Sequence, residues 1–286
     1  MSAFSSLLLP SFFLFPGQPL QLLPNPPTRF SRLRCHRRDS TSVATMVKSK
    51  AIRVHELGGP EVLRWEEVEV GEPGEGEIRI RTTAVGVNFI DIYFRKGVYA
   101  APTMPFTPGM EAVGVVTAVG PGLTGRKVGD VVAYAGNPMG SYAQEQILPA
   151  AVAVPVPPSV DHKQAASVML KGMTAHVLLR RVFKASLECL ASRGFLVSFG
   201  QSSGKPDPIP TSDLASKSLF LTRPSLMHYT ATRDELLESA GEVFANVANG
   251  VLHVRVNHTY PLSEAAQAHA DLEGRKTSGS IVLIPG

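Results

Sequence analysis

Cysteine is nearly absent from this chain. Among 286 residues there are two, Cys35 and Cys189, which is too few for a disulfide framework or a cysteine-rich zinc site. The eight histidines are dispersed and form no HExxH pair. His253 and His258 are five positions apart along a predicted strand, so their side chains should point to opposite faces and cannot share a metal ion. The sequence therefore predicts no metal site, and Cys189 is interpreted as a small apolar residue in a helix.

Long apolar runs are also missing. The longest candidate, SLLLPSFFLF from Ser6 to Phe15, is broken by Pro10 and is much shorter than the roughly 20 residues that cross a bilayer as a helix. The sequence therefore predicts no transmembrane helix.

Acidic residues are lacking at the start of the chain. Residues 1–45 contain five arginines against Asp39 alone, so residues 46–286 carry 23 basic and 23 acidic side chains. Residues 46–286 are therefore neutral overall and show no basic stripe, so the sequence predicts no binding to nucleic acid. The leader is rich in serine, proline and arginine, which is typical of an organelle transit peptide. We expect the chloroplast, with a mitochondrial location, or a cytoplasmic product that starts at Met46, as alternatives.

The pattern of apolar residues along the chain changes near residue 156. From Lys50 to Val156, short alternating segments separated by glycine and proline predict a β-rich barrel or sandwich. The periodicity then predicts a helix over 161–193, strands in FLVSFG and SLFLTRP, and a helix that begins at the capping box Thr232 and Glu235. A strand in VLHVRVN, a helix in SEAAQAHADLEG and a strand in SIVLIPG complete the expected elements.

Two motifs suggest functions that their context does not support. Gly200-Gln-Ser-Ser-Gly204 matches the G-x-S-x-G turn of serine hydrolases, but that turn must open a helix. Here KPDPIP follows, and its prolines prevent a regular helix. Gly120 to Gly125 reads G-x-G-x-x-G, yet a strand and not a helix follows it, so we predict a surface hairpin turn.

Several ordered segments together resemble one family. They are KAIRVHELGGPEVLRWEEVEVGEPGEGEIRIRTTAVGVNFIDIYFRKGVY, MPFTPGMEAVGVVTAVG, KVGDVVAYAG, GSYAQ, AASVMLKGMTAHVLL, ASRGFLVSFGQSSG, LFLTRPSL and TSGSIVLIPG. They resemble the NADPH:quinone oxidoreductases of the medium-chain dehydrogenase/reductase superfamily. The resemblance implies an α/β protein, in which a GroES-like β-rich catalytic domain is followed by a Rossmann-type nucleotide-binding domain. NADPH is the implied cofactor, and a quinone or related enone is the implied substrate.

The resemblance also implies the site residues. Zinc-dependent relatives carry Cys where GVNFID has Asn88 and His where PGMEA has Met110, so this chain matches the zinc-free branch. Asn88, Asp91 and Tyr93 are the polar groups placed at the catalytic cleft, although each is also compatible with a purely structural role at a strand end. The cofactor-binding candidates that the resemblance implies are Lys171, Thr174, Phe199, Gly200, Ser202, Phe220, Arg223 and Lys276.

One segment of the family pattern is missing. Lys184 runs directly into Ala185 where the family has the AAGGVG phosphate turn and further βα units, a loss of roughly 80 to 100 residues at about 30 per unit. We therefore expect residues 1–45 as transit peptide, 46–160 as the GroES-like domain, 161–256 as a truncated Rossmann remnant, and 257–286 as a segment that returns to the catalytic domain. Two hypotheses follow: an impaired quinone oxidoreductase that can form a homodimer, or a non-catalytic isoform that associates with a full-length partner.

Overall fold

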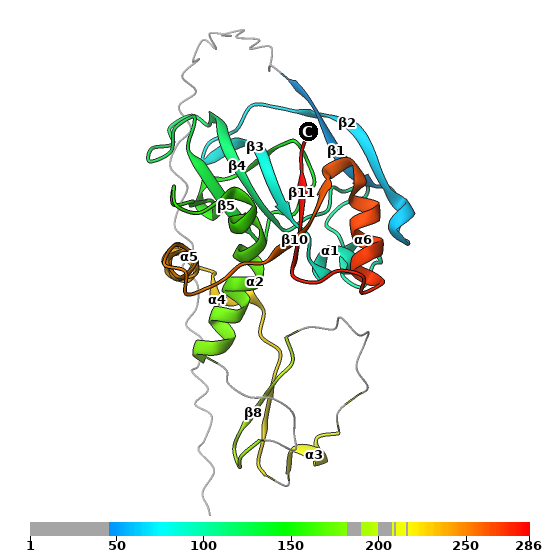
Figure 1. Ribbon diagram of the computed structural model, residues 1–286, viewed down its shortest axis with the longest axis vertical. Coiled ribbons are helices and arrows are strands. Elements are labelled where there is room, and N and C mark those ends of the chain that lie inside the picture. Colours follow the sequence, from blue (N-terminus) through cyan, green and yellow to red (C-terminus); the bar gives the residue numbers. More distant parts are fainter. Residues whose placement is uncertain (1–45, 182–189, 200–207, 209, 216) are drawn as a thin grey trace, which may run out of the picture. The chain divides into compact units, whose positions relative to one another are not determined.

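The computed structural model describes residues 46–181, 190–199, 208, 210–215 and 217–286 (Figure 1). All of them belong to the unit Val43–Gly286. The predictions for the leader, for Cys189 and for the turn from Gly200 to Gly204, which includes Ser202, lie outside the described residues.

Antiparallel strands dominate up to residue 156, as the alternating pattern predicts. β1 (Val47–Val54) pairs with β2 (Leu63–Val70) in a small sheet of their own. A second sheet has the strand order β10-β11-β3-β4-β5-β7, with β6 paired to β3. Its strands are β3 (Glu77–Gly86), β4 (Glu111–Val119), β5 (Val131–Ala135), β6 (Glu145–Pro149), β7 (Val154–Pro155), β10 (Val256–Pro261) and β11 (Ser280–Ile284).

β3 explains how the sequence pattern sets the fold. Ile78, Ile80 and Thr82 are buried while Arg81 between them is exposed, the alternation expected when one face of a strand meets the core. Its first half pairs with β6, and its last two residues pair with β11. The C-terminal strand therefore completes the same sheet as the N-terminal strands.

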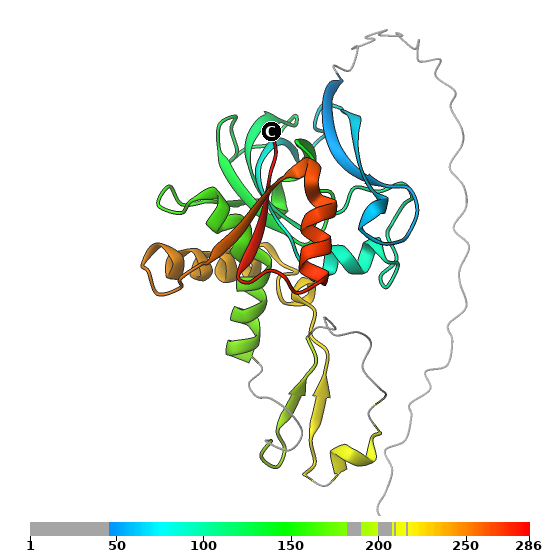
Figure 2. The ribbon, with the colours of Figure 1, turned by 45° about the vertical axis from the view of Figure 1, so that its right-hand side comes forward.

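Helices cover this sheet. α2 (His162–Arg181) packs across it, and α5 (Arg233–Ala248) packs on α2. Met169 and Met173 of α2 and Phe244 of α5 are almost fully buried together with sheet residues. α1 (Phe89–Arg95) and α6 (Ala265–Glu273) lie side by side in both ribbon views (Figures 1 and 2). The remaining helical turns are η1 (Pro60–Val62), η2 (Ala150–Val152), η3 (Leu262–Glu264), α3 (Ser212–Ala215) and α4 (Leu226–Tyr229).

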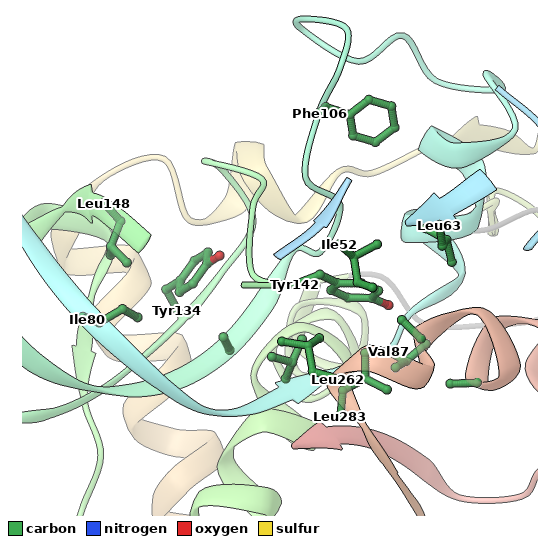
Figure 3. Packing of buried hydrophobic residues seen from close by; sticks show 14 of the residues in the cluster. Ile52, Leu63, Ile80, Val87, Phe106, Tyr134, Tyr142, Leu148, Leu262 and Leu283 are labelled. Carbon is green, nitrogen blue, oxygen red and sulfur yellow. The ribbon is translucent and has the colours of Figure 1, made fainter. Parts of the chain in front are cut away.

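A second apolar cluster fills the space between the β1–β2 pair, the large sheet and α6. Ile52 and Tyr142 meet Leu262 and Leu283 at its centre (Figure 3). Leu262 and Leu283 come from the C-terminal segment, so the last 30 residues supply part of the core of the N-terminal strands.

Two short strands stand apart from the large sheet. β8 (Phe195–Val197) and β9 (Phe220–Thr222) form a parallel pair, and the rings of Phe195 and Phe220 stack at 4.8 Å. These rings are 47% and 52% exposed. Parallel strands are ordinarily covered on both faces, so this pair has more exposed apolar surface than its type normally carries.

Most predicted elements are confirmed, and two boundaries are wrong. The capping box at Thr232 and Glu235 begins α5, and Asn249 ends it. The predicted strand VLHVRVN is wrong in its first half, because β10 starts only at Val256, so His253 and His258 do not share a strand. The helix predicted over 161–193 ends at Arg181 among the described residues, since residues 190–193 are not helical. The G-x-G-x-x-G segment forms the turn between β4 and β5, as predicted.

Two helical glycines test the packing of α2 on α5. A Cβ atom at Gly172 would lie 2.6 Å from Val168 Cγ2 and 2.9 Å from Val243 Cγ1, whereas a Cβ at Gly241 would meet nothing within 4 Å. We expect Gly241→Ala to stabilise the protein by about 0.5–1 kcal/mol through helix propensity. We expect Gly172→Ala to destabilise it by about 1–2 kcal/mol, because overpacking against stiff valines outweighs the same gain. Urea unfolding of both variants checks this, and equal shifts would contradict the close approach of the helices.

Candidate functional site

The candidate site forms where β3 ends and α1 begins. Asn88 precedes α1 with extended backbone angles, φ −135° and ψ 154°, and its backbone N–H donates to Asp91 Oδ2 at 2.9 Å. An acidic residue three positions into a helix is well placed to accept a backbone N–H at the helix start. The turn from strand to helix thus fixes both Asn88 and Asp91.

The Asn88 side chain uses both ends of its amide. Nδ2 donates to Glu111 Oε2 at 2.8 Å and to the Gly86 carbonyl at 3.3 Å, and Oδ1 accepts from Lys171 Nζ at 2.8 Å. A carboxylate faces the amide nitrogen and an ammonium faces the amide oxygen, so only one orientation of the Asn88 amide satisfies both groups. Asn88 is only 6% exposed, so it links α1 to β4 and α2.

Glu111 is a fully buried carboxylate at the first position of β4. Its Oε1 accepts the backbone N–H of Leu170 at 2.8 Å, and its Oε2 lies 3.4 Å from Lys171 Nζ. Buried carboxylates are tolerated when donors surround them. Sequence reasoning missed Glu111, although a single acid at the start of the apolar strand EAVGVVTAV was a usable signal.

Lys171 lies on the solvent-exposed side of this cluster. Its side chain is 40% exposed, whereas the Glu111 side chain is 0% exposed. The Lys171 ammonium also lies 3.4 Å from the Val87 carbonyl. The three N–H groups of the ammonium thus face three acceptors, and the contacts with Glu111 and Val87 are long at 3.4 Å, so a ligand oxygen can be bound by replacing one of these two.

Asp91 is buried behind Asn88 and is 0% exposed. Burial raises the pKa of its carboxyl to about 7, against the opposing effects of the Asn88 N–H and the Tyr142 hydroxyl. The carboxyl does not reach solvent, and its contact with the cluster is the hydrogen bond from the Asn88 backbone N–H.

Tyr93 and Arg223 belong to a neighbouring group. The Tyr93 and Tyr99 rings meet edge to face at 5.4 Å, and Arg223 Nη2 donates to the Tyr99 hydroxyl at 3.3 Å. Tyr99 therefore links the end of β9 to α1, and brings two predicted site residues close together.

The other predicted cofactor residues are dispersed. Thr174 Oγ1 donates to the Leu170 carbonyl at 2.7 Å, so the hydrogen bond of its hydroxyl lies within α2. Phe199 is 66% exposed and Phe220 stacks on Phe195. Lys276 pairs with Asp271 at 3.4 Å in the turn between α6 and β11. Gly200 and Ser202 lie outside the described residues.

The described part of the chain contains no group of three His, Cys, Asp or Glu side chains that could hold a metal ion. In the same part, no helix combines the length and apolar character needed to cross a bilayer. At the position where zinc-dependent relatives of the resembled family carry histidine, Met110 is 2% exposed and packs as an apolar side chain.

Comparisons with known proteins bear on this site. Residues 74–158 match the alcohol dehydrogenase GroES-like domain, and residues 159–283 match the zinc-binding dehydrogenase family. The quinone oxidoreductase of Pseudomonas aeruginosa is 32% identical over 324 residues, which cover 83% of this chain and 100% of that protein. The chain belongs to the quinone oxidoreductase family. The expected combination of a GroES-like domain and a Rossmann-type domain is thereby confirmed.

Other relatives of this quinone oxidoreductase family member extend the comparison. The 2-haloacrylate reductase of a Burkholderia species is 34% identical over 325 residues, covering 81% of this chain and 98% of that protein. The crystal structure of Escherichia coli quinone oxidoreductase complexed with NADPH matches with a TM-score of 0.79 at 32% identity, covering 82% of this chain and 100% of that one. A quinone oxidoreductase from Pseudomonas syringae matches with a TM-score of 0.80 at 31% identity, covering 83% and 100%.

Glu111 offers a direct test of the cluster. In Glu111→Gln the amide nitrogen either faces the donors Asn88 Nδ2 and Lys171 Nζ or replaces the acceptor for Leu170 N–H. We expect a loss of about 2–4 kcal/mol of unfolding free energy, because a buried acceptor is lost in either orientation. Urea unfolding measures it, with the exposed Glu75→Gln as control, for which a change within about 0.5 kcal/mol is expected. Equal values for both variants would show that the buried carboxylate contributes nothing.

Proposed function

We propose that this chain is an NADPH-dependent oxidoreductase that reduces a quinone or a related enone, and that it binds its cofactor weakly. The observation that carries the proposal is the contact of Lys171 with Asn88 and Glu111 in a member of the quinone oxidoreductase family. Quinones and enones share an electron-poor conjugated carbonyl, and a relative named for 2-haloacrylate reduction supports the broader substrate class.

The residues present fit the nicotinamide end of NADPH better than its phosphate end. The family resemblance assigns Lys171 and Thr174 to the nicotinamide and ribose, and Lys171 presents a partly exposed ammonium. Phosphate groups are ordinarily held by a glycine-rich turn between a strand and a helix. The chain has one G-x-G-x-x-G, and that segment is the turn between two antiparallel strands, β4 and β5.

We infer that a missing segment is the cause of this mismatch. The alignment with the Pseudomonas protein spans 324 residues and uses 83% of a 286-residue chain, about 237 residues. The difference of about 87 residues agrees with the 80 to 100 expected between Lys184 and Ala185. Charge-assisted hydrogen bonds to phosphate contribute about 1.5–3 kcal/mol each, so the loss of several weakens NADPH binding by orders of magnitude.

When bound, NADPH supplies a hydride to the substrate. No step of that transfer follows from the described residues, because the one G-x-G-x-x-G segment lies between two strands and not at the start of a helix. Lys171 is proposed to donate a hydrogen bond to an oxygen of the bound ligand, while Asn88 and Glu111 orient its ammonium.

The alternative is a non-catalytic isoform that associates with a full-length relative. The exposed rings of Phe195 and Phe220 on β8 and β9 favour it, because a pair of parallel strands with exposed apolar faces gains stability from a partner. A homodimer of this chain is a separate proposal, in which a second copy covers the same apolar faces. We propose the chloroplast as the location of this protein, because the composition of residues 1–45 is typical of a transit peptide.

Cofactor titration tests the proposal. We expect the full chain to show blue-shifted NADPH fluorescence only at millimolar concentration, with slow quinone-dependent oxidation of NADPH. Lys171→Met should weaken binding a further tenfold or more, because one charge-assisted hydrogen bond is lost. Lys163→Met, an exposed lysine of the same helix, should leave the titration unchanged.

Absence of any fluorescence change at millimolar NADPH would contradict the enzymatic proposal for this chain. Size-exclusion chromatography after co-expression with the full-length form then tests the alternative. A complex of the two forms would support association, and exclusively aggregated protein would contradict it.

A further inference from the structure

A chain of buried polar groups leads away from Asp91 toward the protein surface. The Tyr142 hydroxyl donates to Asp91 Oδ2 at 3.2 Å, and it lies 2.9 Å from His269 Nε2. His269 Nδ1 lies 3.1 Å from Arg95 Nη1. Tyr142, His269 and Arg95 are each 0% exposed. Three segments distant in sequence, α1, the approach to β6 and α6, thus meet in one hydrogen-bonded series.

The series has a fixed direction. A guanidinium group can only donate, so His269 Nδ1 must accept from Arg95, and the imidazole proton is on Nε2. Nε2–H then donates to the Tyr142 oxygen, whose own hydrogen points to Asp91. Burial, together with the Arg95 charge, lowers the pKa of His269 to about 3, so the imidazole stays neutral across the physiological range.

The outer end of the series is anchored. Arg95 Nη2 donates to Glu273 Oε2 at 2.5 Å, and Arg95 Nε donates to the Gly58 carbonyl at 3.2 Å. Glu273 also pairs with Lys96, whose side chain is 46% exposed. The buried guanidinium is therefore neutralised at the surface and keeps its donor directed at His269.

At the inner end the two oxygens of Asp91 differ. Oδ2 accepts two hydrogens, from the Asn88 backbone and from Tyr142. Oδ1 is buried and has no hydrogen-bond partner in the described part of the chain. A proton bound by Asp91 is therefore confined to Oδ1, and Oδ2 remains the acceptor that fixes Asn88.

We propose that Tyr142, His269 and Arg95 are positioning residues for the candidate site, which hold Asp91 Oδ2 toward the Asn88 backbone and thereby fix Asn88 between Lys171 and Glu111. The importance of this arrangement for catalysis rests on the proposed function. The arrangement itself is independent of cofactor and is measurable without it.

The charged groups that face Asp91 influence the pKa that a titration of its carboxyl measures. Lys171 on α2 lowers the pKa of Asp91, and Glu111 on β4 raises it. Arg95 on its own helix and neutral His269 on α6 act through Tyr142. Loss of the Tyr142 hydroxyl removes one donor to the carboxylate, so the pKa of Asp91 should rise further.

Nuclear magnetic resonance of the full chain tests the proposal. In the unsubstituted protein we expect ¹⁵N signals of His269 that report the Nε2–H tautomer and do not titrate between about pH 5 and 9. In Tyr142→Phe the ¹³C titration midpoint of the Asp91 carboxyl should rise by about one unit or more, and the Asn88 side-chain amide signals should shift. Tyr134→Phe is the matched control, because Tyr134 is equally buried but bonds to Gln146.

Two results would overturn the proposal: an Nδ1–H tautomer of His269, or the same Asp91 midpoint in Tyr142→Phe as in Tyr134→Phe. If Tyr142→Phe fails to fold, the tautomer in the unsubstituted chain decides. Failure of NADPH binding would contradict the proposed function and leave these signals unaffected, so the two failures are distinguishable.

The same groups predict opposite dependences of stability on pH. The pKa of Asp91 is raised from its ordinary value of 3.8 to about 7, so its favourable contribution is present below pH 3.8 and is lost as pH rises to about 7. The pKa of His269 is lowered from 6.5 to about 3, so its contribution is present above pH 6.5 and is lost as pH falls. Between about pH 4 and 6.5 the two effects oppose each other.

Urea unfolding across pH separates the two effects. Relative to the unsubstituted chain, Asp91→Asn should gain stability with rising pH between about 4 and 7, by up to tenfold in the folding equilibrium constant per pH unit. His269→Gln should gain relative stability as pH falls below 6.5. Parallel curves for all three proteins would show that neither group is perturbed.

Discussion

Burial of the Glu111 carboxylate is the constraint on which the site depends. It receives donors from the end of β3, through Asn88, and from α2, through the Leu170 backbone and the Lys171 ammonium. Gly86 makes this approach sterically feasible, since a Cβ there would lie 2.1 Å from the Ala166 carbonyl and 2.2 Å from Glu111 Oε2. A buried carboxylate without these donors would be strongly unfavourable, so the carboxylate and the packing of α2 on the sheet require each other.

The C-terminal segment completes the site from a distance. β11 pairs with the last residues of β3, and α6 brings His269 into contact with Tyr142 and Arg95. The polar side chains around Asp91 are thus supplied by parts of the chain that lie far apart in the sequence.

The β8–β9 pair carries exposed apolar side chains. In a parallel sheet, neighbouring strands and helices cover both faces, and here Phe195 and Phe220 remain about half exposed. Exposed apolar rings on a parallel pair support the segment that we propose to be missing between Lys184 and Ala185.

The sequence by itself determined the local elements and the family. Alternating apolar residues predicted β1 to β6, the capping box predicted the start of α5, and a series of ordered motifs indicated Asn88, Asp91 and Lys171. Only the tertiary structure identified Glu111, Tyr142, His269 and Arg95 as members of one hydrogen-bonded site. Their contacts join residues 23 to 174 positions apart, and no local periodicity encodes a hydrogen bond across such a separation. Burial then decided their chemistry, because desolvation is the largest cause of the shifted pKa values of Asp91 and His269.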